Sequence, residues 1–405
     1  MAPENGAGGS QPVRPELRAS PADERRYPTV ADLREGARRR VPKFALDYIE
    51  GGTDDNATMA RNREAFDRVA IVPRQGTGLL KPSVEVDILG TRYSGPFGVA
   101  PMGLGALVWP KMEVSLAKAA QAANIPYVLS TAGGASIEAI AGCAPDVWWF
   151  QLFGVPRDDH RITFDLIKRA RTGQAKALVL TIDTPVQARR PQDIRNGLSV
   201  PFRPSLPILL NMAMRPRWLS KIAVSGTPGC EVFRKYVGEN ASTEMLSNFA
   251  RTEIQGGFTW ELMKRIRDSW SSKLVVKGIL HPEDAEKAVA IGADGIVVSN
   301  HGGRTFDAAP AAMSVLPDVV TAVGGRAIVM LDSGVRSGLD VVRAASRGAG
   351  LVFMGRPFLY SVAALGERGG VHLSALIRAD VERILTQLGA ESIQALRSSV
   401  TVSTY

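Results

Sequence analysis

Eight short runs of apolar and β-branched residues recur along the chain between about residues 97 and 357. Most are separated by segments of helical periodicity, such as EVSLAKAAQAA and PEDAEKAVAIG. Apolar strands that alternate with amphipathic helices indicate a parallel sheet with crossover connections. Eight such units close naturally, so we predict an α/β fold, a (β/α)8 TIM barrel. A doubly wound open sheet is the alternative, but no GxGxxG follows the first run. The runs are GVAPM, YVLST, WWFQLF, ALVLTID, KLVVKG, GIVVSNHG, AIVMLDSG and LVFMGRP.

Polar or special residues follow nearly every one of these strands. A purely structural strand has no reason to end in this way. In a barrel the carboxyl ends of all strands form one face, and that face carries the chemistry. We therefore expect these strand ends to form a single site: Ser130–Thr131, Gln151, Thr181–Asp183, Lys277, Ser299–His301, Asp332–Gly334 and Gly355–Arg356.

The regular spacing breaks once, after the fourth strand. Residues of about 190–255 are predicted to be an insertion there, and they include LPILLNMAM and RPRWLSKIAV. Apolar residues, a tryptophan and a basic surplus are typical of a segment that lies on a membrane surface. An active-site lid or a subunit contact is the alternative. Residues 201–238 contain one acid, Glu231, and six basic residues: Arg203, Arg215, Arg217, Lys221, Arg234 and Lys235.

The segment before the first strand divides into two parts. Residues 1–26 are polar and lack the apolar core of a secretory signal, so we expect a disordered tail. Residues 27–405 are predicted to be one barrel domain that begins with an N-terminal helical extension. The sequence contains no run of 18 apolar residues, so we predict no membrane-spanning helix. The cytoplasm is the expected location, with peripheral attachment to the inner face of the plasma membrane if the insertion binds lipid.

Composition narrows the kind of site. Two cysteines are too few for a disulfide framework or a cysteine-rich zinc site. Four histidines leave little room for a histidine-rich metal centre, and we predict no metal site. The formal net charge of +9 favours an anionic partner. Nucleic acid is not predicted, because no basic helix with interleaved aromatic residues is present. The anionic partner that we predict is therefore a ligand that carries a phosphate or a carboxylate.

The sequence SNHGGR, at residues 299–304, is the sharpest local motif. His301 is suited to act as a general base, and Arg304 can hold a carboxylate through two parallel hydrogen bonds. Asp183 could orient the imidazole and stabilise it once protonated. Arg190 could be a second carboxylate ligand, with Arg189 as its rival. A core histidine with solvated arginines is the alternative.

The ends of strands seven and eight suggest a phosphate site. Glycines and arginines in Asp332–Arg336 and in Gly355–Arg356 suit a phosphate monoester, such as FMN or a sugar phosphate. Ordinary tight turns are the alternative. Lys277 ends an apolar strand and needs an anion nearby. It could stabilise negative charge that appears during a reaction, or it could form a Schiff base.

The chain resembles the FMN-dependent 2-hydroxy-acid dehydrogenase/oxidase family from about residue 27 to residue 396, most closely its membrane-associated mandelate and lactate dehydrogenases. The motifs that carry the resemblance are VPKFALDYIEGG, NREAFDRVAIVPR, WWFQLF, LTIDTP, VVKG, SNHGGR, LDSGVR and MGRPFLY. The resemblance implies His301 as base, Asp183 as its partner and Lys277 as the group that stabilises the reduced ring. It implies substrate binding by Tyr48, Phe153, Arg190 and Arg304. It implies an FMN site made of Pro101, Met102, Gly103, Ser130, Gln151, Thr181, Lys277, Ser299, Asp332, Ser333, Gly334, Arg336, Gly355 and Arg356.

Several positions depart from the family pattern. Phe153 stands where the family usually has tyrosine, and Thr305 stands where it usually has glutamine. Gly103 replaces the alanine common in oxidases, which favours an acceptor other than oxygen. Ala132 leaves room for a bulky substrate where some members carry tryptophan.

We therefore expect oxidation of an (S)-2-hydroxy acid, aromatic such as mandelate or lactate-like, to the 2-oxo acid, with a quinone-type electron acceptor and a homotetrameric enzyme. An oxidase that forms hydrogen peroxide is one alternative. A flavin-binding protein whose chemistry is impaired by Phe153 is another.

Overall fold

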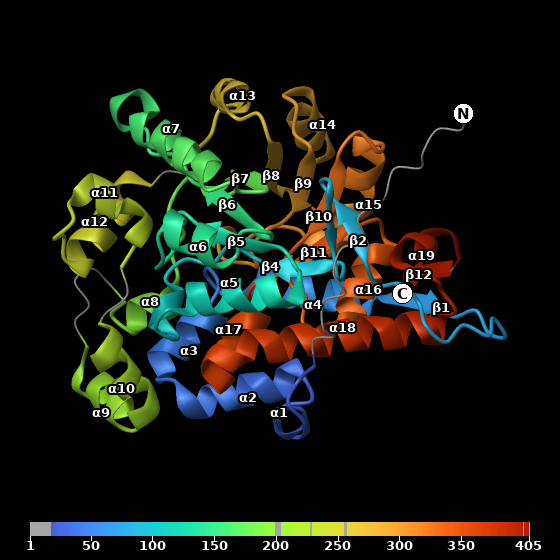
Figure 1. Ribbon diagram of the computed structural model, residues 1–405, viewed down its shortest axis with the longest axis horizontal. Helices are drawn as coiled ribbons and strands as arrows, with labels where there is room; N and C mark the ends of the chain where they lie inside the picture. The colour runs from blue at the N-terminus through green and yellow to red at the C-terminus, as the bar shows by residue number, and fades with distance from the viewer. Residues whose placement is uncertain (1–17, 199–203, 227–228, 255–256, 400, 405) are drawn as a thin grey trace, which may run out of the picture.

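The structure is a computed structural model that describes residues 18–198, 204–226, 229–254, 257–399 and 401–404. Eight parallel strands close into a barrel at its centre (Figure 1). Each strand pairs with the next one in the chain, and β11 pairs with β4 to close the barrel. The predicted (β/α)8 barrel is therefore confirmed. Its strands are β4 (Phe97–Val99), β5 (Tyr127–Ser130), β6 (Trp148–Leu152), β7 (Ala177–Thr181), β8 (Lys273–Ile279), β9 (Gly295–Val298), β10 (Ile328–Leu331) and β11 (Leu351–Met354).

The strands read as continuous apolar runs because both of their faces are covered. Every residue of β5, β6, β7, β9 and β11 is buried. Helices cover the outer face of the barrel, and side chains fill its interior, as in other closed parallel sheets. The helices that follow the strands are α5 (Met112–Ala123), α6 (Ile137–Cys143), α7 (Arg157–Thr172), α13 (Trp260–Ser269), α14 (Pro282–Ala290), α15 (Ala312–Val323), α16 (Gly338–Ser346) and α17 (Arg356–Leu365).

An N-terminal helical extension precedes the barrel, as predicted. It comprises α1 (Pro21–Arg26), α2 (Val30–Arg40), α3 (Lys43–Glu50) and α4 (Ala57–Asp67). Thr29 and Asp32 form a reciprocal capping box that begins α2. The helix α2 packs against α17, the helix that follows the last barrel strand. The extension therefore lies against the end of the barrel domain.

The expected disordered tail is wrong for residues 21–26, which form α1. Proline at the first position, acids in the first turn and arginines in the last turn all favour a helix. Asp23 is buried and forms an ion pair with Arg368 at 2.7 Å, which ties this helix to the domain. Residues 1–17 lie outside the described residues.

Elements outside the barrel complete the fold. The strands β2 (Val86–Ile88) and β3 (Thr91–Tyr93) form an antiparallel pair. The strand β1 (Val69–Val72) pairs with β12 (Thr401–Thr404). The long helix α18 (Gly369–Leu388) packs on α5, α16 and α17, and α19 (Ile393–Ser399) packs on α16.

The segment between β7 and β8 holds a chain of short helices where the sequence predicts an insertion. They are α8 (Pro191–Arg195), α9 (Leu206–Ala213), α10 (Pro216–Ser225), η2 (Glu231–Phe233), α11 (Arg234–Val237) and α12 (Thr243–Glu253). Among the described residues, no helix is both long and apolar enough to cross a membrane.

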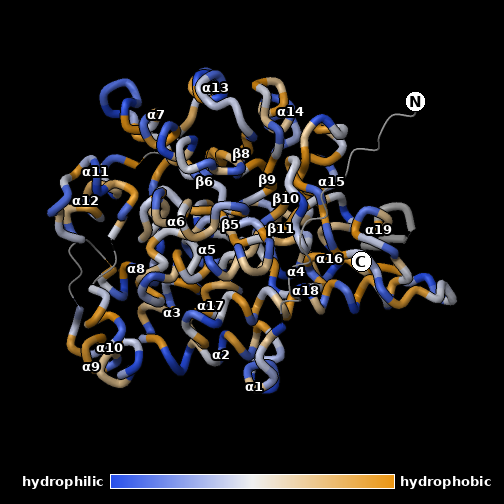
Figure 2. The backbone as a smooth tube through the Cα atoms, in the orientation of Figure 1, coloured by the Kyte–Doolittle hydropathy of each residue, from blue (hydrophilic) through white to orange (hydrophobic). Residues whose placement is uncertain are grey.

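Helices α9 and α10 project at one edge of the molecule, and Figure 2 shows hydrophobic residues along them. No residue of α9 is buried. Large apolar side chains of this pair are instead exposed to solvent: Leu206, Leu209, Leu210, Met214, Leu219 and Val224. An exposed apolar cluster of this size is typical of an interaction surface.

Candidate active site

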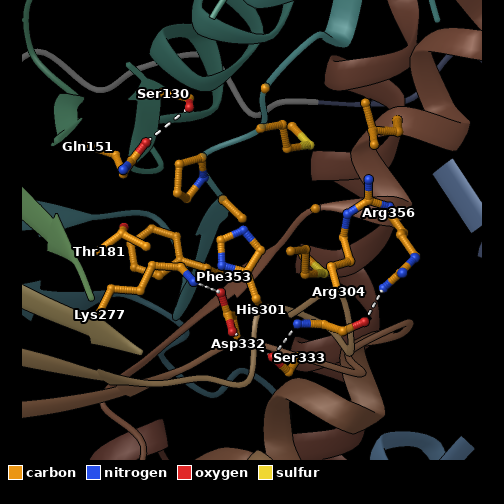
Figure 3. Close-up of a pocket in the computed structure, with 18 of the residues that line it drawn as sticks. Ser130, Gln151, Thr181, Lys277, His301, Arg304, Asp332, Ser333, Phe353 and Arg356 are labelled. Atoms are coloured by element: carbon orange, nitrogen blue, oxygen red, sulfur yellow. Dashed lines mark hydrogen bonds and ion pairs between the residues drawn. The ribbon is translucent and has the colours of Figure 1, made fainter. Parts of the chain in front are cut away.

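A cavity opens where the carboxyl ends of the barrel strands meet (Figure 3). Of the residues that the family resemblance assigns to the site, all but Asp183 and Ser299 line it, whereas Thr131, Ile182 and Asn300 of the strand ends do not. Asp183 and Ser299 lie behind the wall, where they contact the wall residues His301 and Lys277. The structure thus brings most of the predicted strand-end residues together around one cavity.

His301 and Asp183 form a paired base and carboxylate. The Nδ1 atom of His301 lies 2.9 Å from Oδ1 of Asp183. Burial opposes the charge on Asp183, but His301 and Lys277 outweigh it and lower the pKa of this carboxyl below its usual value. An ionised Asp183 orients the ring and stabilises it when protonated, so this pair can accept a proton from a ligand in the cavity.

The loop after β9 places His301 in position. His301, Gly302 and Gly303 all adopt left-handed backbone angles, with φ of 57°, 67° and 73°. The backbone N–H of His301 donates to Ser299 Oγ at 3.0 Å, and that of Gly302 donates to Ser333 Oγ at 2.9 Å. Successive left-handed residues turn the chain sharply, which explains the two glycines after the histidine.

Lys277 is a buried cation with two polar partners. Its Nζ donates to Ser299 Oγ at 2.8 Å and lies 3.1 Å from Oδ2 of Asp332. Burial alone would lower the pKa of Lys277, but the carboxylates of Asp332 and Asp183 raise it overall. The ammonium therefore stays charged at neutral pH. It can stabilise negative charge on a ligand, whereas the neutral amine needed for a Schiff base is disfavoured.

Tyr48 lies between two arginines at one side of the cavity. The guanidinium of Arg304 lies 4.9 Å from the centre of its ring, and that of Arg190 lies 5.7 Å from it. Arg304 donates to the backbone carbonyls of Tyr48 and Gly51, each at 2.8 Å. Burial lowers the pKa of Arg304, which still leaves it charged at neutral pH. This group can hold a carboxylate.

The sequence offers two neighbouring arginines, Arg189 and Arg190, as the second ligand of a carboxylate. Arg190 lines the cavity and pairs with Asp193 at 3.1 Å. Arg189 is exposed and does not appear among the residues that line the cavity. The geometry therefore favours Arg190.

A second group of arginines lies at the ends of β10 and β11. Arg356 donates to the carbonyls of Ile49, Gly302 and Gly51 at 2.8–3.0 Å, and Arg336 donates to its own neighbour's carbonyl at 2.7 Å. Burial and the nearby cations Arg336 and Arg304 lower the pKa of Arg356 to about 9. In the described part of the chain, Arg304, Arg336 and Arg356 form no salt bridge with a carboxylate. Crowded cations without acidic partners indicate an anion site.

Unsatisfied polar atoms mark the opposite wall. Gln151 Nε2 and Thr181 Oγ1 are buried and lack a hydrogen-bond partner within the described residues. The other end of the amide is satisfied, because Gln151 Oε1 accepts from Ser130 Oγ at 3.0 Å. Buried polar groups rarely remain unpaired, so these atoms point to a polar ligand.

The sequence did not identify several residues of the wall. Apolar side chains complete it: Ile49, Ala100, Phe353, Met354 and Leu359. Phe353 belongs to β11 and appears in the sequence as one more core residue. No local signal separates an apolar residue that faces a ligand from one that faces the core, so these residues could not be singled out.

The comparisons with known proteins agree with this geometry. The model of the FMN-dependent dehydrogenase family matches residues 37–403. The chain belongs to the FMN-dependent dehydrogenase family. The (S)-mandelate dehydrogenase of Pseudomonas putida is 37% identical over 367 residues, which cover 91% of this chain and 92% of that protein. The L-lactate dehydrogenase of Caulobacter vibrioides is 35% identical over 375 residues, which cover 92% of this chain and 97% of that one.

Solved structures give the same result. The monotopic membrane protein (S)-mandelate dehydrogenase superimposes with a TM-score of 0.87 and 36% identity, over 92% of this chain and 98% of that chain. Mandelate oxidase superimposes with a TM-score of 0.80 and 33% identity, over 93% and 99%. This FMN-dependent dehydrogenase is thus an oxidoreductase that acts on the CH–OH group of 2-hydroxy acids, and FMN is its cofactor.

The cavity suits FMN on its own chemistry. The unpaired amide of Gln151 and hydroxyl of Thr181 can meet polar edges of a flavin ring. Arg336 and Arg356 can bind a phosphate, which would supply the negative charge that these two arginines lack among the described residues. When bound, FMN supplies the capacity to accept two electrons from the substrate.

Proposed function

We propose that this protein oxidises an (S)-2-hydroxy acid to the corresponding 2-oxo acid and passes the electrons through FMN to a quinone-type acceptor. The observation that carries the proposal is the arrangement of one cavity wall. His301, which pairs with Asp183 behind the wall, faces the same cavity as Arg304, Arg190 and Tyr48. A base beside a carboxylate site is what removal of hydrogen next to a carboxylate requires.

Each catalytic role follows from a contact. Arg304 and Arg190, with Tyr48 between them, hold the substrate carboxylate. The unprotonated Nε2 of His301 removes a proton from the substrate, because Nδ1 is engaged with Asp183. Asp183 stabilises the imidazolium that results. Lys277 would stabilise negative charge on the ring of a bound flavin.

The cofactor site is proposed from the remaining wall residues. Pro101, Met102 and Gly103, with Ser130, Gln151 and Thr181, would line the flavin ring. Ser299 would act indirectly, through its contact with Lys277. The ribityl chain and phosphate would lie against Asp332, Ser333, Gly334, Arg336, Gly355 and Arg356.

Small residues near the base favour an aromatic substrate. Gly103 and Ala132 both line the cavity, and a Cβ added at Gly103 would lie 3.2 Å from the Cβ of Ala132. Neither position fills the cavity with a large side chain, and Phe153 adds an apolar ring to the same lining. Mandelate-like acids therefore suit this wall better than lactate does.

Anaerobic titration of the flavin-loaded protein tests the proposal. Mandelate, lactate and glycolate are added in turn while the absorbance of the oxidised flavin is followed. We expect bleaching, with mandelate most effective at low concentration. If no 2-hydroxy acid bleaches the flavin, the protein is a flavin binder with impaired chemistry. Stoichiometric peroxide, formed in air faster than a quinone analogue is reduced, would instead identify an oxidase.

We also propose that helices α9 and α10 attach the enzyme to the inner face of the plasma membrane. Their exposed apolar side chains support this, as does the basic surplus of the segment. A quinone acceptor dissolves in the bilayer, so attachment brings the enzyme to its acceptor. Flotation with vesicles of anionic lipid tests the attachment. Leu206→Ser combined with Leu210→Ser should leave the protein unbound while its flavin content stays the same.

The proposed homotetramer has support from the family resemblance alone. Light scattering on the purified protein tests it, and a monomeric mass would contradict it.

A further inference from the structure

Helix α3 carries Tyr48 but cannot cap its own N-terminus. The helix begins after Pro42, and proline has no side-chain oxygen to accept from the free N–H groups of the first turn. The cap comes from the insertion instead. Asn211, in α9, accepts a hydrogen bond from the backbone N–H of Lys43 at 2.7 Å through its Oδ1 atom. A residue of the insertion thus completes the helix that holds Tyr48.

Trp218, in α10, contacts the same helix one turn before Tyr48. Its ring packs edge-on against Phe44, with ring centroids 5.7 Å apart. Phe44 and Tyr48 are four residues apart and therefore share one face of α3. Trp218 is 2% exposed, although α9 and most of α10 lie in solvent. It anchors an otherwise exposed helix pair.

The same tryptophan also contacts the loop that carries Gly103. Its Nε1 donates to the carbonyl of Leu107 at 3.3 Å. Tyr48 in turn donates to the carbonyl of Gly103 at 2.8 Å. Trp218 therefore contacts both segments that meet at Tyr48. It packs on Phe44 in the helix of Tyr48, and it binds Leu107 in the loop whose Gly103 accepts from Tyr48.

Two further contacts fix α3 from the insertion. Asn196 donates to Asp47 Oδ2 at 2.9 Å, and Arg215 donates to the carbonyl of Val41 at 3.2 Å. The insertion thus contacts the first turn and the middle of α3, and Val41 two residues before the helix. The main barrel strands take no part in these contacts.

We propose that Asn211 and Trp218 are positioning residues that set Tyr48 for substrate binding. This inference rests on the proposed function, because the role of Tyr48 toward the substrate carboxylate is assigned there. Without these two residues, α3 would spend part of its time displaced, and only the remaining fraction would bind substrate. The apparent affinity falls by that fraction, whereas the chemical step in the bound complex is unchanged.

The test uses the full-length, FMN-loaded enzyme with Asn211→Leu, Asn211→Asp and Trp218→Phe. Asn211→Leu keeps the size of the side chain and removes the acceptor, so we expect roughly a fivefold rise in KM with kcat within about twofold. Asn211→Asp keeps an oxygen acceptor and should restore KM. Trp218→Phe keeps the aromatic packing, loses the bond to Leu107 and should raise KM by a smaller factor.

Hydrogen–deuterium exchange supplies a readout that does not depend on turnover. Peptides that cover residues 43–50 should exchange faster in Asn211→Leu than in the wild type. Asn248→Ala serves as the matched control, because Asn248 belongs to α12 of the same insertion and accepts from Arg251 on its own helix. Trp260→Phe, in α13, is the control for loss of an indole. Both controls should leave exchange and KM unchanged.

The outcomes separate the two proposals. Unchanged exchange in α3, or faster exchange with an unchanged KM, overturns the positioning role while the proposed function stands. A rise in KM that Asn211→Asp fails to restore also overturns it, because bulk rather than capping would then matter. A wild-type enzyme that oxidises no 2-hydroxy acid overturns the proposed function and this inference together.

Discussion

A single contact of 2.9 Å between His301 and Asp183 couples the proposed base to a carboxylate with a lowered pKa. His301→Gln removes the base and keeps a polar side chain of similar size. We expect kcat to fall by about 10²- to 10⁴-fold, with FMN still bound. Rapid-mixing measurement of anaerobic flavin bleaching checks this. A loss below tenfold would show that another group removes the proton.

The lowered pKa of Asp183 also predicts a pH dependence of stability. A carboxyl whose folded pKa is lower than its unfolded value of about 3.9 stabilises the fold above that pH. The stabilisation is lost as pH falls through the folded pKa. The difference in unfolding free energy between wild type and Asp183→Asn should therefore shrink as the pH falls below about 4. Urea unfolding at each pH measures it, and a difference that grows below about pH 4 would reverse the assigned sign.

Phe153 is a natural departure that can be reversed. Its backbone N–H donates to Thr131 Oγ1 at 3.1 Å, which fixes the residue at the cavity wall. Phe153→Tyr restores the hydroxyl that the family pattern places here. One hydrogen bond to a developing oxyanion contributes about 1.5–3 kcal/mol, so kcat should rise about 10- to 100-fold. Steady-state turnover of mandelate checks this, and an unchanged kcat would mean that the substrate oxygen lies elsewhere.

At the scale of single residues, the sequence predicted which side chains take part in the chemistry better than it predicted where they lie. It grouped Asp183 with His301 and placed Ser299 among the converging strand ends, because polar residues at neighbouring strand ends meet in a barrel. It could not show that both lie behind the wall. The strand ladder no longer dictates which way a side chain points once the chain has passed the last paired residue.

Among the elements, the loop after β9 contains the tightest backbone requirement of the site. Gly302 has a φ of 67°, and a Cβ there would lie 2.8 Å from Nη1 of Arg356. Gly302→Ala should cost about 1–2 kcal/mol of stability from the left-handed backbone and should also weaken FMN binding. Gly325→Ala is the matched control, because Gly325 has a φ of 78° and open space around it. Thermal unfolding and FMN titration of both variants check this; equal FMN affinities would remove the link to Arg356.

The elements themselves were predictable to different degrees. Each barrel strand coincides with an apolar run, because a strand covered on both faces must be apolar throughout. The short helices of the insertion were not predicted one by one. Their positions depend on contacts such as that between Asn211 and Lys43, which are 168 residues apart and leave no local pattern.

For the whole molecule, the net charge of +9 is partly concentrated where FMN would bind. The cation Arg336 helps to lower the pKa of Arg356, and a phosphate nearby would relieve this repulsion. FMN at 100 times its dissociation constant should stabilise the fold by about 2.7 kcal/mol. Riboflavin lacks the phosphate and should raise Tm less at the same concentration. Thermal unfolding of protein stripped of flavin measures both shifts, and equal shifts would place the phosphate away from these arginines.

The barrel closes through β4 and β11, so its first strand is synthesised long before the partner that completes the barrel. A ribosome makes β4 early, but the partner on its open edge does not exist until residues 351–354 have been translated. During that interval β4 presents unpaired backbone groups, which attract other unfinished chains. The same delay applies to β1, whose partner β12 is made later still. We therefore expect the unfinished chain to associate with other chains more readily than the finished barrel does.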